Sequence, residues 1–371
     1  MIHPDTFAFV IHPIDAKRHI GIKYPLLGKL LTERQIDYFC QFWPPVYLSQ
    51  IDGIRSAASG REITGWFIAA PYTPRAMLRL PVRQVYRKLV QTGRLAERLG
   101  ARIMGLGAFT SVVGDAGVTI ARELDIPVTT GDSYTIAVAV QGLREAARQM
   151  NIDLSNATAA VVGATGAIGA ACSQLLAEDV GRLILVGKRE LATHAAREAC
   201  EGKHARVEAS LDLNSVRQAD LVLAATSAVS AIIQPEHLKP GAVVCDVAVP
   251  RNVSPRVSKV REDVLIIEGG MVEVPGSVNF HFNFGYPAGK AYGCMAETMA
   301  LALEGRYEDY TLGKKIDIER VKDIERIAAR HGFRLAGLRS FEREVTAEQI
   351  ARVRERAEDT RREPALAGAV S

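Results

Sequence analysis

Residues 159–169 read Ala159-Ala160-Val161-Val162-Gly163-Ala164-Thr165-Gly166-Ala167-Ile168-Gly169, with three glycines between an apolar run and a helical pattern. The apolar run predicts a strand, and the pattern after the turn predicts a helix through Leu176. In a turn with this spacing, the first glycine turns the chain, the second lets the backbone approach a pyrophosphate, and the third lets helix and strand pack closely. Free N–H groups at the helix entrance then point at phosphate. The segment predicts a dinucleotide-binding turn made by Gly163, Thr165, Gly166, Ala167, Ile168 and Gly169.

Further apolar runs continue this pattern along the chain, at residues 183–186, 221–224, 242–246 and 264–267. Strands that alternate with helices imply right-handed crossovers and a parallel sheet. The fold class is therefore α/β, with a Rossmann-type doubly wound parallel sheet over residues 151–275.

The end of the second strand of this series indicates which dinucleotide binds. It reads Gly187-Lys188-Arg189, where enzymes that use NAD carry an acidic residue for the ribose hydroxyls. Lys188 and Arg189 can pair with the 2′-phosphate that an acid would repel, so we expect NADP(H). Glu190 follows at once and is the alternative ribose ligand, which would leave the two cations as a solvated pair. We count Thr226 and Ser227 among the candidate cofactor residues, and either hydroxyl is also a candidate donor to an oxyanion.

The rest of the chain has less regular patterns. Short apolar runs and longer helical stretches predict an N-terminal α/β domain over residues 1–150 that binds the substrate or its carrier. Residues 276–345 predict a C-terminal helical region, and residues 346–371 predict an exposed helical or disordered tail.

Composition excludes several classes of protein. The 371 residues are 48% hydrophobic, which excludes a disordered or fibrous chain. The 46 Lys and Arg residues nearly balance the 42 Asp and Glu residues, so we expect no nucleic-acid partner. No uninterrupted apolar stretch of about 18 residues and no leader pattern occurs, so we expect a cytoplasmic protein without a membrane span. A peripheral membrane contact stays open.

The five cysteines are widely spaced, with no CxxC pair and no cluster of metal-ligand spacing. We therefore expect a reducing compartment, no structural disulfide and no metal. Four lie in apolar or helical patterns that predict small buried residues: Cys40, Cys172, Cys200 and Cys245. Cys294 instead follows a loop with glycines and prolines, close to Lys290, at the start of a predicted helix. A thiol in such a place can have a lowered pKa, so Cys294 is the candidate nucleophile, with a buried structural thiol as the alternative.

Five stretches of the chain together resemble a known family. They are Gly105-Leu-Gly-Ala-Phe-Thr-Ser-Val, Pro127-Val-Thr-Thr-Gly-Asp-Ser-Tyr-Thr, Val162-Gly-Ala-Thr-Gly-Ala-Ile-Gly, Ala291-Tyr-Gly-Cys-Met-Ala-Glu-Thr-Met and Arg330-His-Gly-Phe. In order and approximate spacing they resemble the long-chain fatty acyl-(acyl carrier protein) reductases of cyanobacteria, over residues 7–335. The resemblance implies NADPH-dependent reduction of an acyl thioester to a fatty aldehyde, through an acyl-enzyme on Cys294. It also implies an acyl carrier protein or acyl-CoA as donor, and leaves room for an aldehyde-consuming partner.

The chain departs from that family at two places. The cyanobacterial members carry an aromatic residue directly after the cysteine, where this chain has Met295. The family's Gly-Asn-Thr-His-Thr segment is Gly131-Asp132-Ser133-Tyr134-Thr135 here, so no role of that histidine carries over. Tyr134 and His281 are candidate acid or positioning groups, and each also has a structural interpretation. Acyl length and the choice of donor stay open.

Other functions fit parts of the same pattern. A dehydrogenase of the shikimate or glutamyl-tRNA reductase type is compatible with the nucleotide domain, but the second would need Cys40 as its nucleophile and the first a Lys/Asp pair that we do not find. A non-catalytic NADP(H)-binding sensor would keep the glycine turn and not need Cys294. Residues 79–98 predict a basic amphipathic helix, which is either a docking surface for an acidic carrier protein or an ordinary solvated face.

Overall fold

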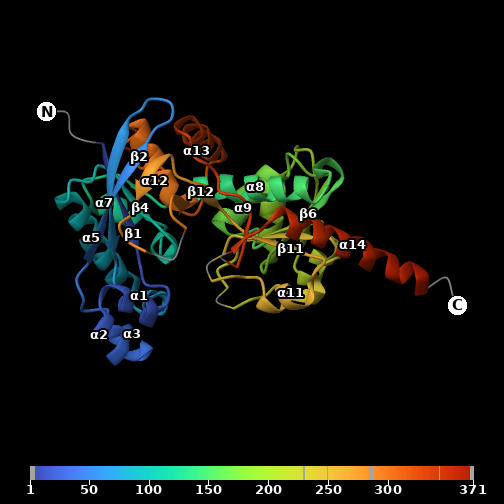
Figure 1. Ribbon diagram of the computed structural model, residues 1–371, viewed down its shortest axis with the longest axis horizontal. Coiled ribbons are helices and arrows are strands. Elements are labelled where there is room, and N and C mark those ends of the chain that lie inside the picture. The colour runs from blue at the N-terminus through green and yellow to red at the C-terminus, as the bar shows by residue number, and fades with distance from the viewer. Residues whose placement is uncertain (1–4, 229, 249, 284–286, 342, 368–371) are drawn as a thin grey trace. The chain divides into compact units, whose positions relative to one another are not determined.

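The computed structural model describes residues 5–228, 230–248, 250–283, 287–341 and 343–367 (Figure 1). The chain forms two compact units, each made from two stretches. The first unit joins Met1–Thr135 to Val272–Arg334, and the second joins Ile136–Met271 to Leu335–Ser371. The 276–345 region set apart in the sequence is thus shared between the two units. Gly285 and Tyr286, in the loop before Cys294, lie outside the described residues.

The first unit is built on a six-stranded mixed sheet in the order β13-β2-β3-β1-β4-β5. Strands β1, β3, β4 and β5 are parallel, and β2 is antiparallel to both β3 and β13. The strand bounds are β1 Thr6–Ile11, β2 Val46–Arg55, β3 Glu62–Ala69, β4 Met104–Leu106, β5 Val128–Thr129 and β13 Gly276–Asn279. The carboxyl ends of the four parallel strands therefore lie at one edge, where open α/β sheets bind ligands.

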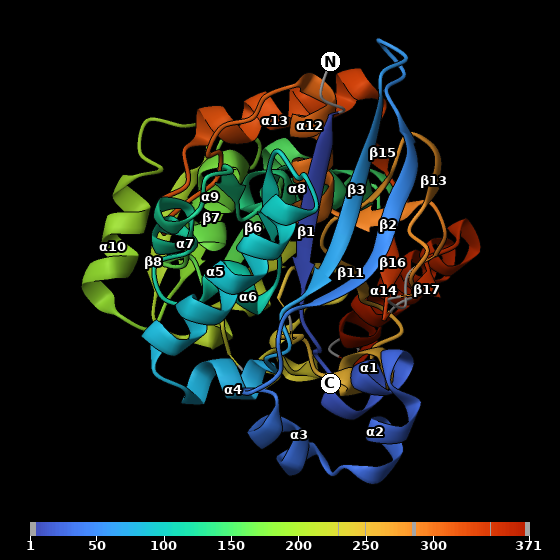
Figure 2. The same ribbon diagram turned by 90° about the vertical axis from the view of Figure 1, so that its left-hand side faces the viewer.

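Helices of the first unit pack on this sheet or extend from it (Figure 2). Helix α12 contacts β1, β3 and β4, and residues 295–303 within it are all buried, although Glu297 and Thr298 among them are polar. Pro81 precedes α5 and begins the basic helix there. The helix bounds are α1 Ala16–Lys23, α2 Pro25–Leu30, α3 Glu33–Phe39, α4 Pro74–Arg79, α5 Val82–Arg98, α6 Phe109–Val112, α7 Val118–Glu123, α12 Gly293–Glu304 and α13 Ile318–His331.

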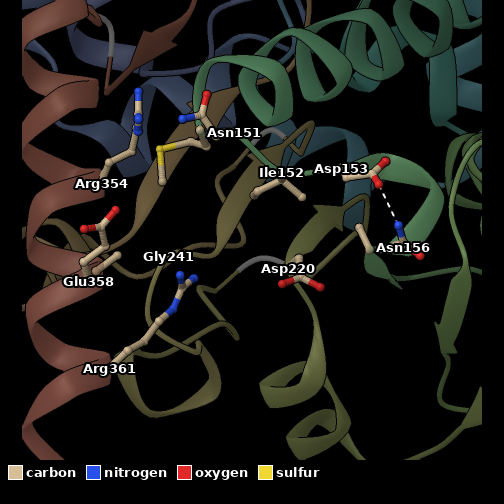
Figure 3. Close-up of a pocket in the computed structure, with 12 residues that line it drawn as sticks. Asn151, Ile152, Asp153, Asn156, Asp220, Gly241, Arg354, Glu358 and Arg361 are labelled. Carbon is tan, nitrogen blue, oxygen red and sulfur yellow. Dashed lines mark hydrogen bonds between the residues drawn. The ribbon is translucent and has the colours of Figure 1, made fainter.

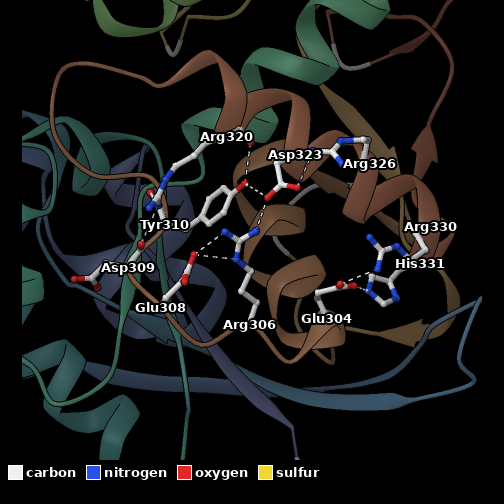
Figure 4. A network of polar contacts seen from close by, with 10 residues as sticks. All are labelled: Glu304, Arg306, Glu308, Asp309, Tyr310, Arg320, Asp323, Arg326, Arg330 and His331. Carbon is white, nitrogen blue, oxygen red and sulfur yellow. Dashed lines mark hydrogen bonds and ion pairs between the residues drawn. The ribbon is translucent and has the colours of Figure 1, made fainter.

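A polar network holds α13 to the carboxyl end of α12 (Figure 4). Arg306 pairs with Asp323, and Glu304 accepts from Arg330 Nη1 at 2.8 Å. His331 lies 2.8 Å from Glu304 through Nε2 and 2.8 Å from Ser56 Oγ through Nδ1. The Arg-His-Gly-Phe motif of the sequence therefore serves to fix α12 against its neighbours.

The second unit contains a six-stranded parallel sheet in the order β11-β10-β9-β6-β7-β8. Its strands are β6 Thr158–Val162, β7 Arg182–Val186, β8 Arg206–Ser210, β9 Leu221–Ala224, β10 Val243–Asp246 and β11 Leu265–Glu268. Its helices are α8 Asp132–Gln149, which begins in the first unit, α9 Ala167–Leu176, α10 Glu190–Glu198, α11 Pro255–Val260 and α14 Ala347–Ala367. This strand order is the Rossmann order, so the expected α/β fold class is confirmed.

Short elements complete the chain: a sheet of β14 Lys290–Tyr292, β12 Met271–Glu273 and β15 Arg334–Leu335, a pair β16 Arg339–Ser340 and β17 Arg343–Glu344, and 3-10 turns η1 Leu154–Asn156, η2 Leu213–Gln218 and η3 Pro235–His237. Helix α14 buries Ile350 and Ala357, and residues 368–371 of the expected tail lie outside the described residues. Among the described helices, none has the length and apolar composition that a membrane span requires.

Candidate active site

Cys294 is the second residue of α12 and lies against the loops that follow β4 and β5. A Cβ atom on Gly131 would lie 2.3 Å from the Cα of Cys294, and one on Gly107 would lie 3.7 Å from its Sγ. Farther along the helix, a Cβ on Gly105 would lie 2.1 Å from Thr298 Oγ1. Three motifs that are far apart in the sequence therefore meet at the carboxyl ends of the parallel strands.

The surroundings of the thiol raise its pKa to about 12. Burial is the largest cause, followed by the negative charges of Asp132 and Glu297. The backbone N–H groups of Met295 and Cys294 act in the opposite direction, by hydrogen bonding to the sulfur. The lowered pKa expected from the helix entrance and the lysine is therefore wrong in direction, because the thiol is buried and the carboxyl groups of Asp132 and Glu297 lie close to it.

Glu297 is a fully buried carboxyl group one turn along α12 from Cys294. It accepts hydrogen bonds from Thr129 Oγ1, from Thr311 Oγ1 at 2.8 Å and from the Tyr134 backbone N–H at 2.8 Å. Burial raises its pKa, which these hydrogen bonds partly offset. Glu297 thus ties α12 to the loop after β5 and fixes the position of Gly131 against Cys294.

Asp132 follows Gly131 directly and is also buried. Burial, and then the charge of Glu297, raise the pKa of Asp132 to about 7. A carboxyl group with a pKa near neutrality can both accept and return a proton under physiological conditions. In the sequence, Asp132 stands out only as a departure from a family pattern. Its place just after a short parallel strand is the signal that could have indicated a role in the active site.

His12 is a further buried side chain at this edge, just after β1, that sequence reasoning missed. Its Nε2 accepts the Phe109 backbone N–H at 3.2 Å, which places the proton on Nδ1. Nδ1 has no hydrogen-bond partner among the described residues. Burial lowers the pKa of His12 to about 4, so the ring is a neutral donor near neutral pH.

Two other candidates have structural partners. The buried Tyr134 ring lies edge-on to Phe333, with ring centroids 6.4 Å apart. His281 is exposed, and its Nε2 lies 2.9 Å from Asp52 Oδ2. These contacts support the structural interpretation of both residues.

Gly131→Ala is expected to lower the free energy of unfolding by at least about 3 kcal/mol, because a Cβ there combines a strained backbone with a clash. Gly131 has φ +75° and its Cβ would overlap Cys294. Gly100→Ala is the matched control, since Gly100 has φ +87° with nothing within 4 Å, and should cost about 1 kcal/mol. Urea unfolding of both variants measures the difference; equal costs would contradict a close approach of Gly131 to Cys294.

The glycine turn of the second unit has the geometry expected from the sequence. Gly163 has φ +89° and donates its N–H to Val186 O at 2.9 Å. A Cβ on Gly169 would lie 2.2 Å from Gly163 O, so only glycine allows this packing. A Cβ on Gly166 would meet nothing closer than 3.4 Å, so the fold itself does not demand glycine there. Glycine at this second position leaves the room that the approach of a dinucleotide phosphate would need.

Polar groups around the turn suit a dinucleotide. No side chain caps α9, so the N–H groups of its first turn, which includes Ala167 and Ile168, lack a side-chain acceptor. Thr226 lies against Gly163, and its N–H donates to Asn252 Oδ1 at 2.9 Å. Asn252 Nδ2 is buried without a partner among the described residues. These groups fit a bound dinucleotide phosphate and its neighbouring polar atoms.

The end of β7 lies beside the turn. A Cβ on Gly187 would lie 3.1 Å from Thr165 Cγ2. Lys188, Arg189 and Glu190 are exposed, and neither cation forms an ion pair with a described residue. Ser227 is exposed on the loop after β9. All the residues proposed for the cofactor are thus at the carboxyl ends of β6, β7 and β9.

A cavity of about 340 Å³ lies elsewhere in the second unit (Figure 3). Asn156 and Asp220, which line it, come just before β6 and β9, and Arg354 and Arg361 reach it from α14. Because dinucleotides bind at the carboxyl ends of such strands, this cavity at their amino ends is no candidate for the cofactor.

The other four cysteines are buried, as the sequence predicts. Cys40, the nucleophile that a glutamyl-tRNA reductase function would need, is fully buried and its Sγ donates to Asp37 O at 3.3 Å. Burial raises its pKa. The backbone of Thr73 and the charges of Arg79 and Lys88 act in the opposite direction but do not outweigh burial.

Known proteins are similar to this chain at two levels. Residues 144–267 match the sequence profile of the Shikimate / quinate 5-dehydrogenase family. The second unit is an NAD(P)-binding Rossmann domain. The glutamyl-tRNA reductase of Thermus thermophilus is 35% identical over 108 residues, 28% of this chain and 27% of that protein.

Two relatives match most of the chain. The aminotransferase PigE of a Serratia species is 30% identical over 362 residues, which cover 93% of this chain and 41% of that protein. This chain therefore spans less than half the length of that relative. The long-chain acyl-[acyl-carrier-protein] reductase of Synechococcus elongatus is 30% identical over 316 residues, which cover 80% of this chain and 90% of that protein.

Proposed function

The chain belongs to the family of long-chain acyl-[acyl-carrier-protein] reductases, and from this premise we propose that it reduces a long-chain fatty acyl thioester to the fatty aldehyde with NADPH. It is an NAD(P)-dependent oxidoreductase of the glutamyl-tRNA reductase and acyl-carrier-protein reductase kind. The observation that carries the proposal is the place of Cys294, at the head of α12 and beside a carboxyl group of near-neutral pKa.

In the proposed first step the sulfur of Cys294 attacks the thioester carbonyl carbon. The new bond joins that carbon to Cys294, the bond to the carrier sulfur breaks, and the carrier leaves as its thiol. Covalent catalysis of this kind lets the bulky carrier depart before reduction. When bound, the dinucleotide supplies the hydride that converts the acyl group to aldehyde. Cys294 is then released and takes a proton to become a thiol again.

Asp132 moves the proton in this scheme. Free thiolate is scarce at neutral pH because the pKa of Cys294 is about 12. The proton must therefore leave as the sulfur–carbon bond forms, and Asp132 accepts it. Its protonation also removes one of the charges that disfavour the thiolate. Asp132 then returns the proton to the departing carrier sulfur, so that the step is balanced.

The oxyanion of each step needs a donor. The backbone N–H groups at the start of α12 suit this role, since Tyr292 provides no side-chain cap and the N–H groups of Cys294 and Met295 already face the sulfur. We prefer them to the hydroxyls of Thr226 and Ser227, which we assign to the cofactor. The neutral Nδ1 donor of His12 is a second candidate.

Lys188→Ala/Arg189→Ala is expected to raise the KM for NADPH roughly ten- to hundredfold and to change the KM for NADH little, because charge-assisted bonds to a 2′-phosphate are lost. Steady-state kinetics with both dinucleotides measure this. Lys259→Ala, which removes an exposed cation of α11, is the control. Equal increases in KM for both dinucleotides would contradict NADPH selectivity. If Glu190→Gln raises the KM for NADH more than the double variant does, Glu190 is the ribose ligand.

The basic face of α5 remains a proposed docking surface for an acidic carrier protein. Arg83, Arg87 and Arg98 are exposed and form no ion pair with a described residue. Lys88 is instead buried and donates to Trp43 O, and Arg94 pairs with Glu97 and Asp125. Three of the six cations counted in residues 79–98 are therefore free for a carrier, which supports a modest electrostatic contribution to encounter.

The direct test is product formation. The purified protein is mixed with NADPH and a long-chain acyl thioester of acyl carrier protein or, in parallel, of coenzyme A, and fatty aldehyde and NADPH loss are measured. We expect equal amounts of aldehyde formed and NADPH consumed. The rates with the two donors, compared, show whether the protein prefers acyl carrier protein or coenzyme A. NADPH binding without aldehyde from either donor would overturn the proposal in favour of a sensor.

A further inference from the structure

Helices α1, α2 and α3 form a small group in the first unit that extends past the carboxyl end of β1 (Figures 1 and 2). Their own core is small: Ala16, Ile20 and Ile36 are buried together. Helices α1 and α2 meet at glycines, where a Cβ on Gly28 would lie 2.6 Å from the Cα of Gly21. Because this hydrophobic core is so small, most of the large apolar side chains of the three helices are exposed to solvent.

The outer side of this group exposes an unusual number of apolar side chains. Leu26 and Leu30, four residues apart on α2 and so on one face, are 73% and 76% exposed. Phe42 is 68% exposed and stacks edge-on with Tyr38, whose ring also contacts Phe39. Scattered exposed apolar residues are normal in proteins, but a cluster marks an interaction surface.

Cations accompany these apolar side chains. Lys17, Arg18, Lys23, Lys29 and Arg34 are all exposed, and none forms an ion pair with a residue that the structure describes. Only two exposed acids, Asp15 and Glu33, lie in the same stretch. Unpaired cations beside apolar and aromatic side chains on short helices are the combination that binds the headgroup region of anionic bilayers.

We propose that this surface, the outer side of α1–α3, binds an anionic lipid bilayer. The apolar side chains enter the boundary between headgroups and acyl chains, and the cations pair with lipid phosphates. A second copy of the chain would bring the same cations to this surface and so be repelled by it. The proposal does not depend on reductase activity, so either one can fail while the other stands.

Sedimentation with lipid vesicles tests the proposal, using the full chain and equal mixtures of phosphatidylglycerol and phosphatidylcholine, with phosphatidylcholine alone as the neutral comparison. We expect binding to the anionic vesicles that weakens with salt. Leu26→Gln/Leu30→Gln and Lys17→Gln/Lys29→Gln should each lower the partition coefficient about tenfold or more. Leu211→Gln/Val260→Gln and Lys259→Gln remove comparably exposed groups of the second unit and should bind as the wild type does.

A second measurement needs no change in the surface. The chain has two tryptophans, Trp43 next to Phe42 and Trp66 in β3, so Trp66→Phe leaves Trp43 as the only indole. Brominated lipids in anionic vesicles should quench its fluorescence. Absent binding, or binding that both surface variants retain, would overturn the proposal. A dimer that dissociates in Leu26→Gln/Leu30→Gln would also overturn it. The same holds if the protein does not bind vesicles and the surface variants instead raise the KM for carrier-bound substrate.

Discussion

Cys294→Ala is expected to form no acyl adduct and to lose reductase activity by at least about 10³-fold, because it removes the atom that accepts the acyl group. Intact mass of the protein, mixed with a long-chain acyl thioester and no NADPH, measures the adduct. The wild type should gain one acyl group and lose it, as aldehyde, when NADPH is added. Because the substitution removes a single sulfur atom from a helix, where alanine is favourable, the alanine variant should fold.

Cys40→Ala is the matched control for this experiment. It removes a different thiol of the first unit, one that is fully buried. It should acylate at the wild-type rate. An adduct that persists in Cys294→Ala and disappears in Cys40→Ala would move the nucleophile to the core and support the glutamyl-tRNA reductase alternative. No adduct in any of the three proteins would remove Cys294 from the mechanism.

Asp132→Asn is expected to slow acylation about 10²- to 10⁴-fold near neutral pH, the usual contribution of a general base. In the wild type the acylation rate should rise with pH through about 7 and then level off, because the base form of Asp132 is populated above its pKa. In the variant the rise should move to alkaline pH, where the thiol itself ionises. The amide keeps the shape of the carboxyl group, so folding is preserved.

The measurement is the acylation rate from quenched mixtures, followed over pH in both proteins. Glu297 also lies near the thiol, so Thr311→Val, which removes one donor to Glu297, tests whether that carboxyl group causes the pH dependence instead. A wild-type profile that is flat through pH 7, or a variant with an unchanged profile, would exclude Asp132 as the base. A slower rate with the same profile would assign it a positioning role.

The sequence predicted the nucleotide domain in detail because its strands are fully buried. Strands β6, β7, β9 and β10 are apolar runs covered on both sides, and such runs stand out from their neighbours. Strand β8, Arg206–Ser210, was missed because it is a half-exposed edge strand with charged residues. Strand β2 was missed because its pairing with β3 shifts register twice and its burial pattern is irregular.

The candidate active site was predicted only in part, because most of it is assembled from distant segments. The place of Cys294 at a helix entrance is a local property, and the helix was found. The rise in its pKa comes first from burial and then from Asp132, more than 150 positions away, and the sequence shows neither the burial nor that proximity. Glu297 and Thr311 likewise become partners only when α12 packs under the loop after β5.

The complete burial of residues 295–303 in α12 limits how members of such a lineage can diverge. A mutation on this helix alters the packed interior and is selected against through stability, whatever it does to catalysis. Residues of the loops after β1, β4 and β5 that do not contact Cys294 or Glu297 are freer to vary, since they lie at the open edge of the sheet. Inherited differences in substrate preference are therefore expected to accumulate in those loops, around a nucleophile that stays in place.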